Sequence, residues 1–277
     1  MSTLASRTLL VGCGKVGTRL AERLIADGGE AFGLRRTTAS LPSSIIPLAV
    51  DLLSPPPVSL PQVDTMVITI TPSIGGSDHP DGYATALKHL AEALPSPPER
   101  TVMVSSTGIF DGPGRAEPIS EADPAAPVTP RAERLLEGEA LAKQLFGAHI
   151  VRPAGIYGPG RGMRLRKVLS GESVQYARRT NRIHETDLVS ILHAMLTHPS
   201  PPELLHAVDQ HPAPLGEVVT FIADLLALSP PPRITPEEPS GNVFDGSRLS
   251  GWFGELQFPS YQDGYRQLIA ERQTHHP

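Results

Sequence analysis

The chain has 277 residues, a formal net charge of −5 at pH 7, one cysteine and ten histidines. The acidic balance gives no basic field for nucleic acid, one cysteine excludes an internal disulfide framework, and no HxxxH or HExxH spacing predicts a metal site. No apolar run approaches the roughly 18 residues that span a bilayer, and the N-terminus lacks the layout of a signal peptide, so we expect a cytoplasmic protein without membrane contact.

The first predicted strand and helix flank a glycine-rich turn. The apolar run at residues 9–11 precedes apolar residues at helical spacing, which begin at Val16. Gly12 permits a tight turn, Gly14 lets backbone amides approach a pyrophosphate, and Gly17 lets the helix pack closely on the strand. The helix N-terminus stabilises the bound anion. The pattern predicts a dinucleotide site with first contacts from Gly12, Gly14, Lys15, Val16 and Gly17.

The end of the second predicted strand, residues 30–34, bears on the choice of cofactor. It leads into Arg35 and Arg36. An acidic residue at this point would bind a free ribose 2′-hydroxyl, whereas an arginine pairs with a 2′-phosphate. The sequence has two arginines and no acid there, so we expect NADP(H) to be favoured over NAD(H). The alternative is a solvated basic loop.

Later predicted strands also lead into residues that suit a ligand. Ligands of open α/β sheets bind at the carboxyl ends of the strands, so we expect these residues to converge on the cofactor. Asp51 could meet an adenine amino group or, alternatively, cap a turn. The strands at residues 45–50, 65–71, 100–104 and 149–151 lead to the candidate cofactor-binding residues Asp51 and Leu52, Thr71, Ser105 and Pro153.

Strand-like and helix-like segments alternate along most of the chain. Helical spacing is clear over residues 83–94, 130–146 and 215–228. This alternation is typical of βαβ units around a parallel sheet. We therefore predict an α/β fold with a Rossmann-type, doubly wound parallel sheet.

Four motifs, in this order, resemble the NAD(P)-dependent epimerase/dehydratase family, the extended short-chain dehydrogenases/reductases. The resemblance covers roughly residues 8–269. The glycine turn has the form GxGxxG where the family more often has TGxxGxxG, which points to an atypical branch. The motifs are the glycine turn at residues 12–17, Ser-Ser-Thr-Gly-Ile-Phe at 105–110, Arg-Pro-Ala-Gly-Ile-Tyr-Gly-Pro-Gly-Arg at 152–161 and Arg-Ile-His-Glu-Thr-Asp-Leu at 182–188.

The resemblance implies two lobes. We expect an NAD(P)-binding domain over residues 1–155 and a small substrate lobe over 156–277, with a strand near 205–208 that returns to the sheet. Members of the family often dimerise through the helices predicted here at 83–94 and 130–146. A homodimer is therefore compatible with the resemblance, but the charges on the second helix do not compel it.

The resemblance also exposes a departure in the catalytic motif. Family members hold the substrate oxygen with a Ser or Thr, here Ser106 or Thr107, and use a Tyr-x-x-x-Lys dyad for proton transfer. In the helix at 130–146, Arg131 stands in place of the tyrosine and Leu135 in place of the lysine. Arginine is too basic for general-base work, and leucine has no charge. We therefore expect the dyad to be missing.

Two functions remain open on the sequence. In the first, the protein is an NAD(P)-dependent oxidoreductase or epimerase/dehydratase-like enzyme for a small carbonyl or sugar-like substrate. Tyr157 would then be the atypical proton donor and Arg161 would bind an anionic substrate group. Alternatively, Tyr157 is a ring packed against the turn at Pro159. In the second function, the protein binds NADP(H) without turnover, as a sensor or regulatory module.

Overall fold

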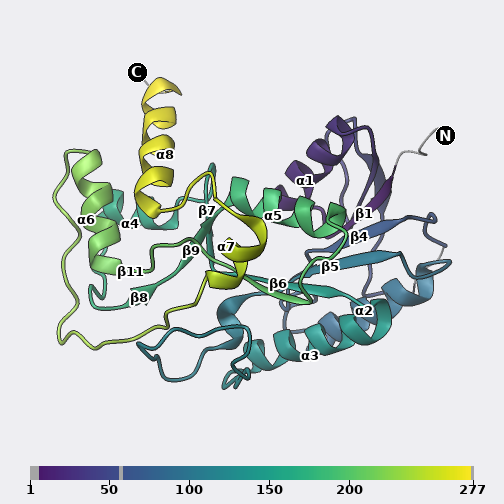
Figure 1. Cartoon of the computed structure of the whole chain (residues 1–277), viewed down its shortest axis with the longest axis horizontal. Helices are drawn as coiled ribbons and strands as arrows, with labels where there is room; N and C mark the ends of the chain where they lie inside the picture. The colour runs from purple at the N-terminus through teal and green to yellow at the C-terminus, as the bar shows by residue number, and fades with distance from the viewer. Residues whose placement is uncertain (1–5, 56–58, 276–277) are drawn as a thin grey trace. The chain divides into compact units, whose positions relative to one another are not determined.

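The largest sheet of the described residues has seven strands in the order β10-β6-β5-β4-β1-β2-β3. The computed structural model describes residues 6–55 and 59–275 (Figure 1). All neighbouring pairs from β6 through to β3 are parallel, which confirms the predicted Rossmann-type sheet. The strands are β1 (Arg7–Val11), β2 (Glu30–Arg35), β3 (Ile46–Ala49), β4 (Thr65–Ile68), β5 (Arg100–Val104), β6 (His149–Pro153) and β10 (Leu204–Ala207).

The composition of the strands matches their places in the sheet. The central strands β1 and β4 are nearly continuous apolar runs, and Leu9, Leu10 and Val67 are completely buried. Strands of a parallel sheet are covered on both faces, so alternation of polar and apolar residues is not expected there. The outermost strand β3 is largely exposed and contains Pro47. An edge strand tolerates proline because one side of it needs no amide donor.

Helices cover both faces of the sheet. In Figure 1, α1 (Lys15–Ala26) lies on one face, and α2 (Gly82–Ala93) and α3 (Pro130–Phe146) lie side by side on the other. The apolar stripe predicted for α1 is buried, as Val16, Leu20 and Leu24 show. The predicted helices at 83–94 and 130–146 are confirmed as α2 and α3, each within one residue of the expected bounds.

Strong local signals set both ends of α3. The side chain of Thr129 accepts a hydrogen bond from the Ala132 amide at 3.3 Å, and Pro130 occupies the first helical position. Both features favour a helix start. At the other end Gly147 has φ of 60°, the left-handed conformation that commonly closes a helix. The first turn of α3, which carries Arg131, is therefore firmly placed.

The described residues divide into two compact units that interleave along the chain. The first unit comprises the described residues up to Ile109, Ala125–Arg152 and Val189–Leu205; the second comprises Phe110–Pro124, Pro153–Leu188 and the described residues from His206 onward. Helix α5 (Glu185–Thr197) begins in the second unit and continues into the first.

The second unit has short strands and its own core. Strand β7 (Gly155–Tyr157) pairs in parallel with β9 (Arg182–His184), and β8 (Arg179–Thr180) pairs antiparallel with β11 (Ala213–Pro214). Its further helices are α4 (Met163–Ser170), α6 (Leu215–Leu225), α7 (Ser247–Phe253) and α8 (Tyr261–His275). The core of this unit gathers apolar side chains from β7, β11, α4, α6 and α8.

Candidate functional site

The predicted glycine turn joins β1 to α1. Gly12 has φ of 78°, and a Cβ placed on it would lie 2.9 Å from Cγ2 of Ile70 and 3.0 Å from the Ile70 amide nitrogen. A side chain at this position would therefore be strained and would clash with the strand end beside it. Gly17 is less restricted. A Cβ placed on it would lie 3.5 Å from Sγ of Cys13, which is an ordinary van der Waals distance.

The N-terminus of α1 is open to an anion. Its N-cap residue is Gly14, which offers no side-chain cap, and the first turn contains no acidic residue. The first amides of a helix have no acceptor within the helix, and the positive end of the helix dipole lies there. The start of α1 therefore has the character of a phosphate-binding helix end.

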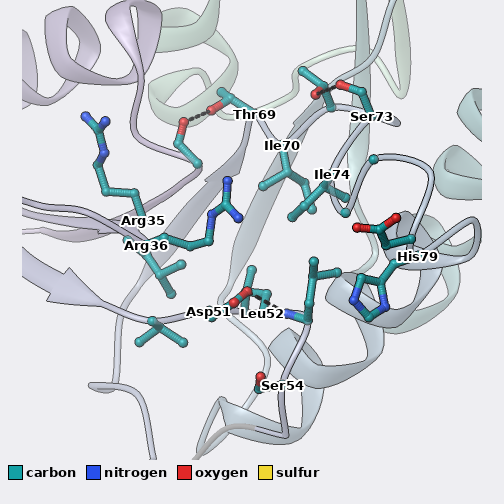
Figure 2. A pocket seen from close by; sticks show the side chains of 18 residues that line it. Arg35, Arg36, Asp51, Leu52, Ser54, Thr69, Ile70, Ser73, Ile74 and His79 are labelled. Carbon is teal, nitrogen blue, oxygen red and sulfur yellow. Dashed lines mark hydrogen bonds between the residues drawn. The ribbon is translucent and has the colours of Figure 1, made fainter.

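A cavity of about 710 Å³ lies at the carboxyl ends of β1, β2, β3 and β4, within the first unit (Figure 2). This volume falls in the range of roughly 300–1,000 Å³ typical of small-molecule sites. Of the residues predicted from the sequence to bind a cofactor, the cavity brings together Gly12, Arg35, Arg36, Asp51, Leu52 and Thr71.

The two arginines and Asp51 lie on one side of the cavity, and Ile74 and His79 lie on the opposite side (Figure 2). Arg35 is partly buried, and its Nη1 donates to the Cys13 carbonyl oxygen at 3.4 Å and to Ser40 Oγ at 3.3 Å. Arg36 is exposed. Arg35 thus ties the end of β2 to the glycine turn, and Arg36 adds a second cation.

Asp51 makes the turn-capping contact that the sequence offered as one of its two alternatives. Its Oδ1 accepts a hydrogen bond from the Leu53 amide at 3.0 Å, which is a turn-capping contact. The residue is also exposed and lines the cavity, and the neighbouring Leu52 is buried with 3% exposure. The turn therefore fixes the position of the carboxylate at the edge of the cavity.

Thr69 is a residue of this region that the sequence argument missed. Its Oγ1 donates to the carbonyl oxygens of Val11 and Gly12 at 3.0 and 2.8 Å, so it fixes the glycine turn from the end of β4. Thr71, which was predicted, lines the cavity and shares a 2.9 Å hydrogen bond with Ser73. A threonine two positions before Thr71 in the predicted strand was the available signal.

The other predicted residues of the glycine turn lie beside the cavity lining and not in it. Gly14 and Lys15 are exposed at the start of α1, whereas Val16 and Gly17 are buried against the sheet. Their positions fit a backbone role at the helix N-terminus and a packing role, respectively.

The predicted Ser-Ser-Thr loop follows β5 in the first unit. The Ser105 amide donates to the Val151 carbonyl oxygen at 2.8 Å, which ties the loop to β6. Ser106 Oγ accepts a hydrogen bond from the Gly108 amide at 2.9 Å, and Thr107 is buried. None of the three lines the cavity of Figure 2. On α3, Arg131 is exposed and Leu135 is buried with 2% exposure.

Pro153, Tyr157 and Arg161 belong to the second unit. Tyr157 is 1% exposed, its hydroxyl donates to the Ser260 carbonyl oxygen at 3.3 Å, and its ring stacks on Tyr265 with the centroids 5.0 Å apart. Burial raises the pKa of Tyr157 above its usual range. These contacts bury the ring against Tyr265 and do not present the Tyr157 hydroxyl to solvent.

Arg161 is engaged within the second unit as well. Its Nε donates to Oε2 of Glu185, a buried carboxylate at the start of α5, and the two form an ion pair. The charge of Arg161 is therefore matched by a carboxylate of the chain itself. Pro153 is the last residue of β6.

The second unit also buries a charge pair that predicts a pH dependence of stability. Asp209 and Arg182 are 3% and 0% exposed, with 3.9 Å between Arg182 Nη1 and Asp209 Oδ2. Burial raises the pKa of Asp209 to about 7, although Arg182, His211 and Arg164 act in the opposite direction. The desolvation of the carboxylate therefore exceeds the stabilisation that these neighbours give its charged form.

We expect the free energy of unfolding to fall as the pH rises from about 4 to about 7. In this range Asp209 of the folded chain still binds a proton. In the unfolded chain the same carboxyl group, with a pKa of about 3.9, has released it. Asp209→Asn removes this titration. Urea unfolding across this range should therefore show the variant gaining stability relative to the native chain as the pH rises. A constant or shrinking difference would contradict the prediction.

In the described part of the chain, no helix has the length and apolar character needed to cross a membrane. Within residues 6–55 and 59–275, no group of three or more His, Cys, Asp or Glu side chains is arranged to hold a metal ion.

Comparison with known proteins places this architecture in a class. The parallel sheet, the glycine turn and the cavity at the strand ends define a Rossmann-type fold. Neither a protein-family model nor a curated protein matches the chain. A solved structure from Methylobacillus flagellatus, provisionally assigned as an NAD-dependent epimerase/dehydratase, is similar with 27% identity and a TM-score of 0.80, over 98% of this chain and 100% of that chain.

Two sugar-nucleotide dehydratases have the same fold. TunA, an NAD-dependent NDP-hexosamine 5,6-dehydratase of tunicamycin biosynthesis, has 20% identity and a TM-score of 0.77 over 97% of this chain and 98% of that chain. DesIV, a dTDP-glucose 4,6-dehydratase from Streptomyces venezuelae with NAD and TYD bound, has 17% identity and a TM-score of 0.75 over 96% and 97%. The chain thus shares the fold of these NAD-dependent epimerase/dehydratase-like proteins, as its motifs predict.

Proposed function

We propose that the chain binds a nicotinamide dinucleotide in the cavity of the first unit and acts as an NAD(P)-dependent oxidoreductase or epimerase/dehydratase-like enzyme on a small carbonyl or sugar-like substrate. The observation that carries the proposal is the cavity itself, which opens where the glycine turn, two arginines and Asp51 meet. The bound NAD and the sugar-nucleotide chemistry of proteins with the same fold support it.

The residues present fit a dinucleotide. The turn from Gly12 to Gly17 and the uncapped start of α1 would hold the pyrophosphate, because backbone amides there can donate to its oxygens. Asp51 and Leu52 would hold the adenine, the first by hydrogen bonding and the second by apolar contact. A nicotinamide dinucleotide, when bound, supplies hydride transfer.

We further propose that NADP(H) is preferred over NAD(H). Arg35 and Arg36 are the cations at the end of β2, where a carboxylate would favour a free 2′-hydroxyl. Arg35 is already oriented by Cys13 and Ser40, so less side-chain freedom is lost when it binds a phosphate. Ser105, which follows β5 in the same unit, is a proposed contact to the remainder of the cofactor.

Calorimetric titration with NADPH, NADP+, NADH and NAD+ tests this proposal. For the double variant Arg35→Ala/Arg36→Ala we expect the affinity for NADPH and NADP+ to fall about 100-fold or more, because each lost charge-assisted contact is worth roughly 1.5–3 kcal/mol. The affinity for NADH should change little. Lys88→Ala is the matched control, since it removes one exposed positive charge of α2 outside the cavity.

The outcomes of this titration are distinct. Failure of all four nucleotides to bind the native chain would refute the cofactor site. Equal losses for NADPH and NADH in the double variant would refute the 2′-phosphate assignment while retaining the site, because such losses would reflect damage to the glycine turn through Arg35.

A second candidate function is an NADP(H)-binding sensor or regulatory module without turnover. The observation that favours it is α3, where an exposed Arg131 and a buried Leu135 occupy the positions that the family resemblance gives to Tyr and Lys. A binding-competent protein that oxidises no NADPH with any of a panel of aldehydes, ketones and nucleotide sugars would support this second function. Turnover that Ser106→Ala abolishes would support the enzyme.

A further inference from the structure

Two hydrogen-bond donors of the first unit converge at Gly108. A Cβ placed on Gly108 would lie 3.1 Å from Nη1 of Arg131 and 3.1 Å from Oγ of Ser106. The absence of a side chain at residue 108 therefore creates the space in which the guanidinium of α3 approaches the loop after β5. Thr129 and Pro130 fix the start of α3, on which Arg131 lies, and the Gly108 amide holds Ser106 Oγ.

Both groups can donate to the same ligand. Ser106 Oγ accepts a hydrogen bond from the Gly108 amide, and its own proton is available to another acceptor. Arg131 is exposed, and among the described residues its guanidinium has no ion-pair or hydrogen-bond partner. On the same helix, the carboxylate of Glu139 is bound to Arg152 by two hydrogen bonds of 2.9 and 2.7 Å.

We infer that Ser106 and Arg131 form an anion-binding subsite that takes a carboxylate of the substrate. Arginine stays protonated at all relevant pH values, so this pair can hold an anion but cannot accept a proton from the substrate. One guanidinium matches the single charge of a carboxylate and its planar pair of oxygens. A phosphate, with nearly two charges, would be left undercompensated.

This inference rests on the proposed function, since it names the substrate class as a carboxylate-bearing hydroxy acid, keto acid or sugar acid. It gives Arg131 a binding role. The charge of Arg131 would orient the substrate against Ser106, and proton transfer would have to come from a group outside this pair.

The test is an NMR titration of the full chain that follows the backbone amide resonances of Gly108 and Arg131. The probes are glycolate, pyruvate and glucuronate, the neutral amides glycolamide and glucuronamide, and inorganic phosphate. We expect at least one carboxylate to bind, and its amide analogue and phosphate to bind far more weakly. Arg131→Gln should lower the affinity for that carboxylate about 10- to 100-fold. Lys143→Gln, which removes an exposed charge elsewhere on α3, should have no effect.

A second variant tests the geometry. Gly108→Ala retains both donors but places a methyl group 3.1 Å from each of them. This variant should therefore lower the affinity for the carboxylate while the chain stays folded. No carboxylate binding by the native chain, binding that survives Arg131→Gln, or phosphate binding as tight as that of a carboxylate would each overturn the inference. The titration is done without nucleotide, so failure of NADPH to bind would refute the proposed function separately.

Discussion

Glu139→Gln is expected to lower the free energy of unfolding by about 3–5 kcal/mol. Glu139 of α3 and Arg152 of β6 have side chains only 4% and 6% exposed, and they make two parallel hydrogen bonds of 2.9 and 2.7 Å. Removal of the carboxylate charge takes away the ion pair that Glu139 makes with the buried guanidinium. Urea denaturation followed by circular dichroism measures the change.

Two companion variants separate this explanation from a general sensitivity of the fold. Glu172→Gln breaks the exposed pair of Lys167 and Glu172, whose Oε1 and Nζ are 2.8 Å apart, and should cost only about 0–1 kcal/mol. The double variant Glu139→Leu/Arg152→Met removes both buried charges and should recover much of the loss. A double variant as unstable as Glu139→Gln would show that the damage comes from packing.

Gly138→Ala is expected to destabilise the protein by about 1–3 kcal/mol through overpacking. Gly138 lies in the middle of α3, and a Cβ on it would be 2.2 Å from Cε1 of Tyr83 on α2. The tyrosine ring, 2% exposed, thus fills the space of a missing side chain. Helix propensity alone predicts the opposite sign, since alanine is favoured over glycine in a helix by roughly 0.5–1 kcal/mol.

Gly251→Ala is the matched control for this sign. Gly251 also lies within a helix, α7, but a Cβ on it would meet no atom within 4 Å, so this variant should be slightly more stable than the native chain. Combining Gly138→Ala with Tyr83→Ala should cost less than the sum of the single changes, because the ring that clashes is gone. If the losses in stability of the two single variants simply add, the strain in Gly138→Ala does not come from the Tyr83 ring.

The sequence alone predicted the elements whose signals are local. The glycine turn and the apolar runs at β1, β4 and β5 are continuous in the chain, because the strands are buried on both faces. The predicted ends of strands and helices were less accurate where contacts with distant parts of the chain decide where the element stops. The third strand was predicted over residues 45–50 and covers Ile46–Ala49, and the helix predicted over 215–228 ends at Leu225.

The site was less predictable from the sequence, because its side chains bind to residues that are far away along the chain. Tyr157 and Arg161 stand next to a glycine-rich turn, which suggests chemistry. The hydroxyl of Tyr157, however, bonds to a carbonyl 103 residues further along, and Arg161 is paired with Glu185. The proximity of Arg131 to Ser106 similarly depends on the packing of α3 beside the loop after β5. No periodic pattern in the sequence encodes such pairings.

The interleaving of the two units has a consequence for synthesis on the ribosome. Strand β6 is complete at Pro153, but its outer neighbour β10 is not made until Ala207, after a long segment of the second unit. The nascent chain therefore exposes an unpaired strand edge during this interval, and such edges template aggregation. Translation that stalls within this interval would leave the sheet with an unpaired edge at β6. Because the two units interleave, neither can be transferred to another gene as a single uninterrupted coding segment.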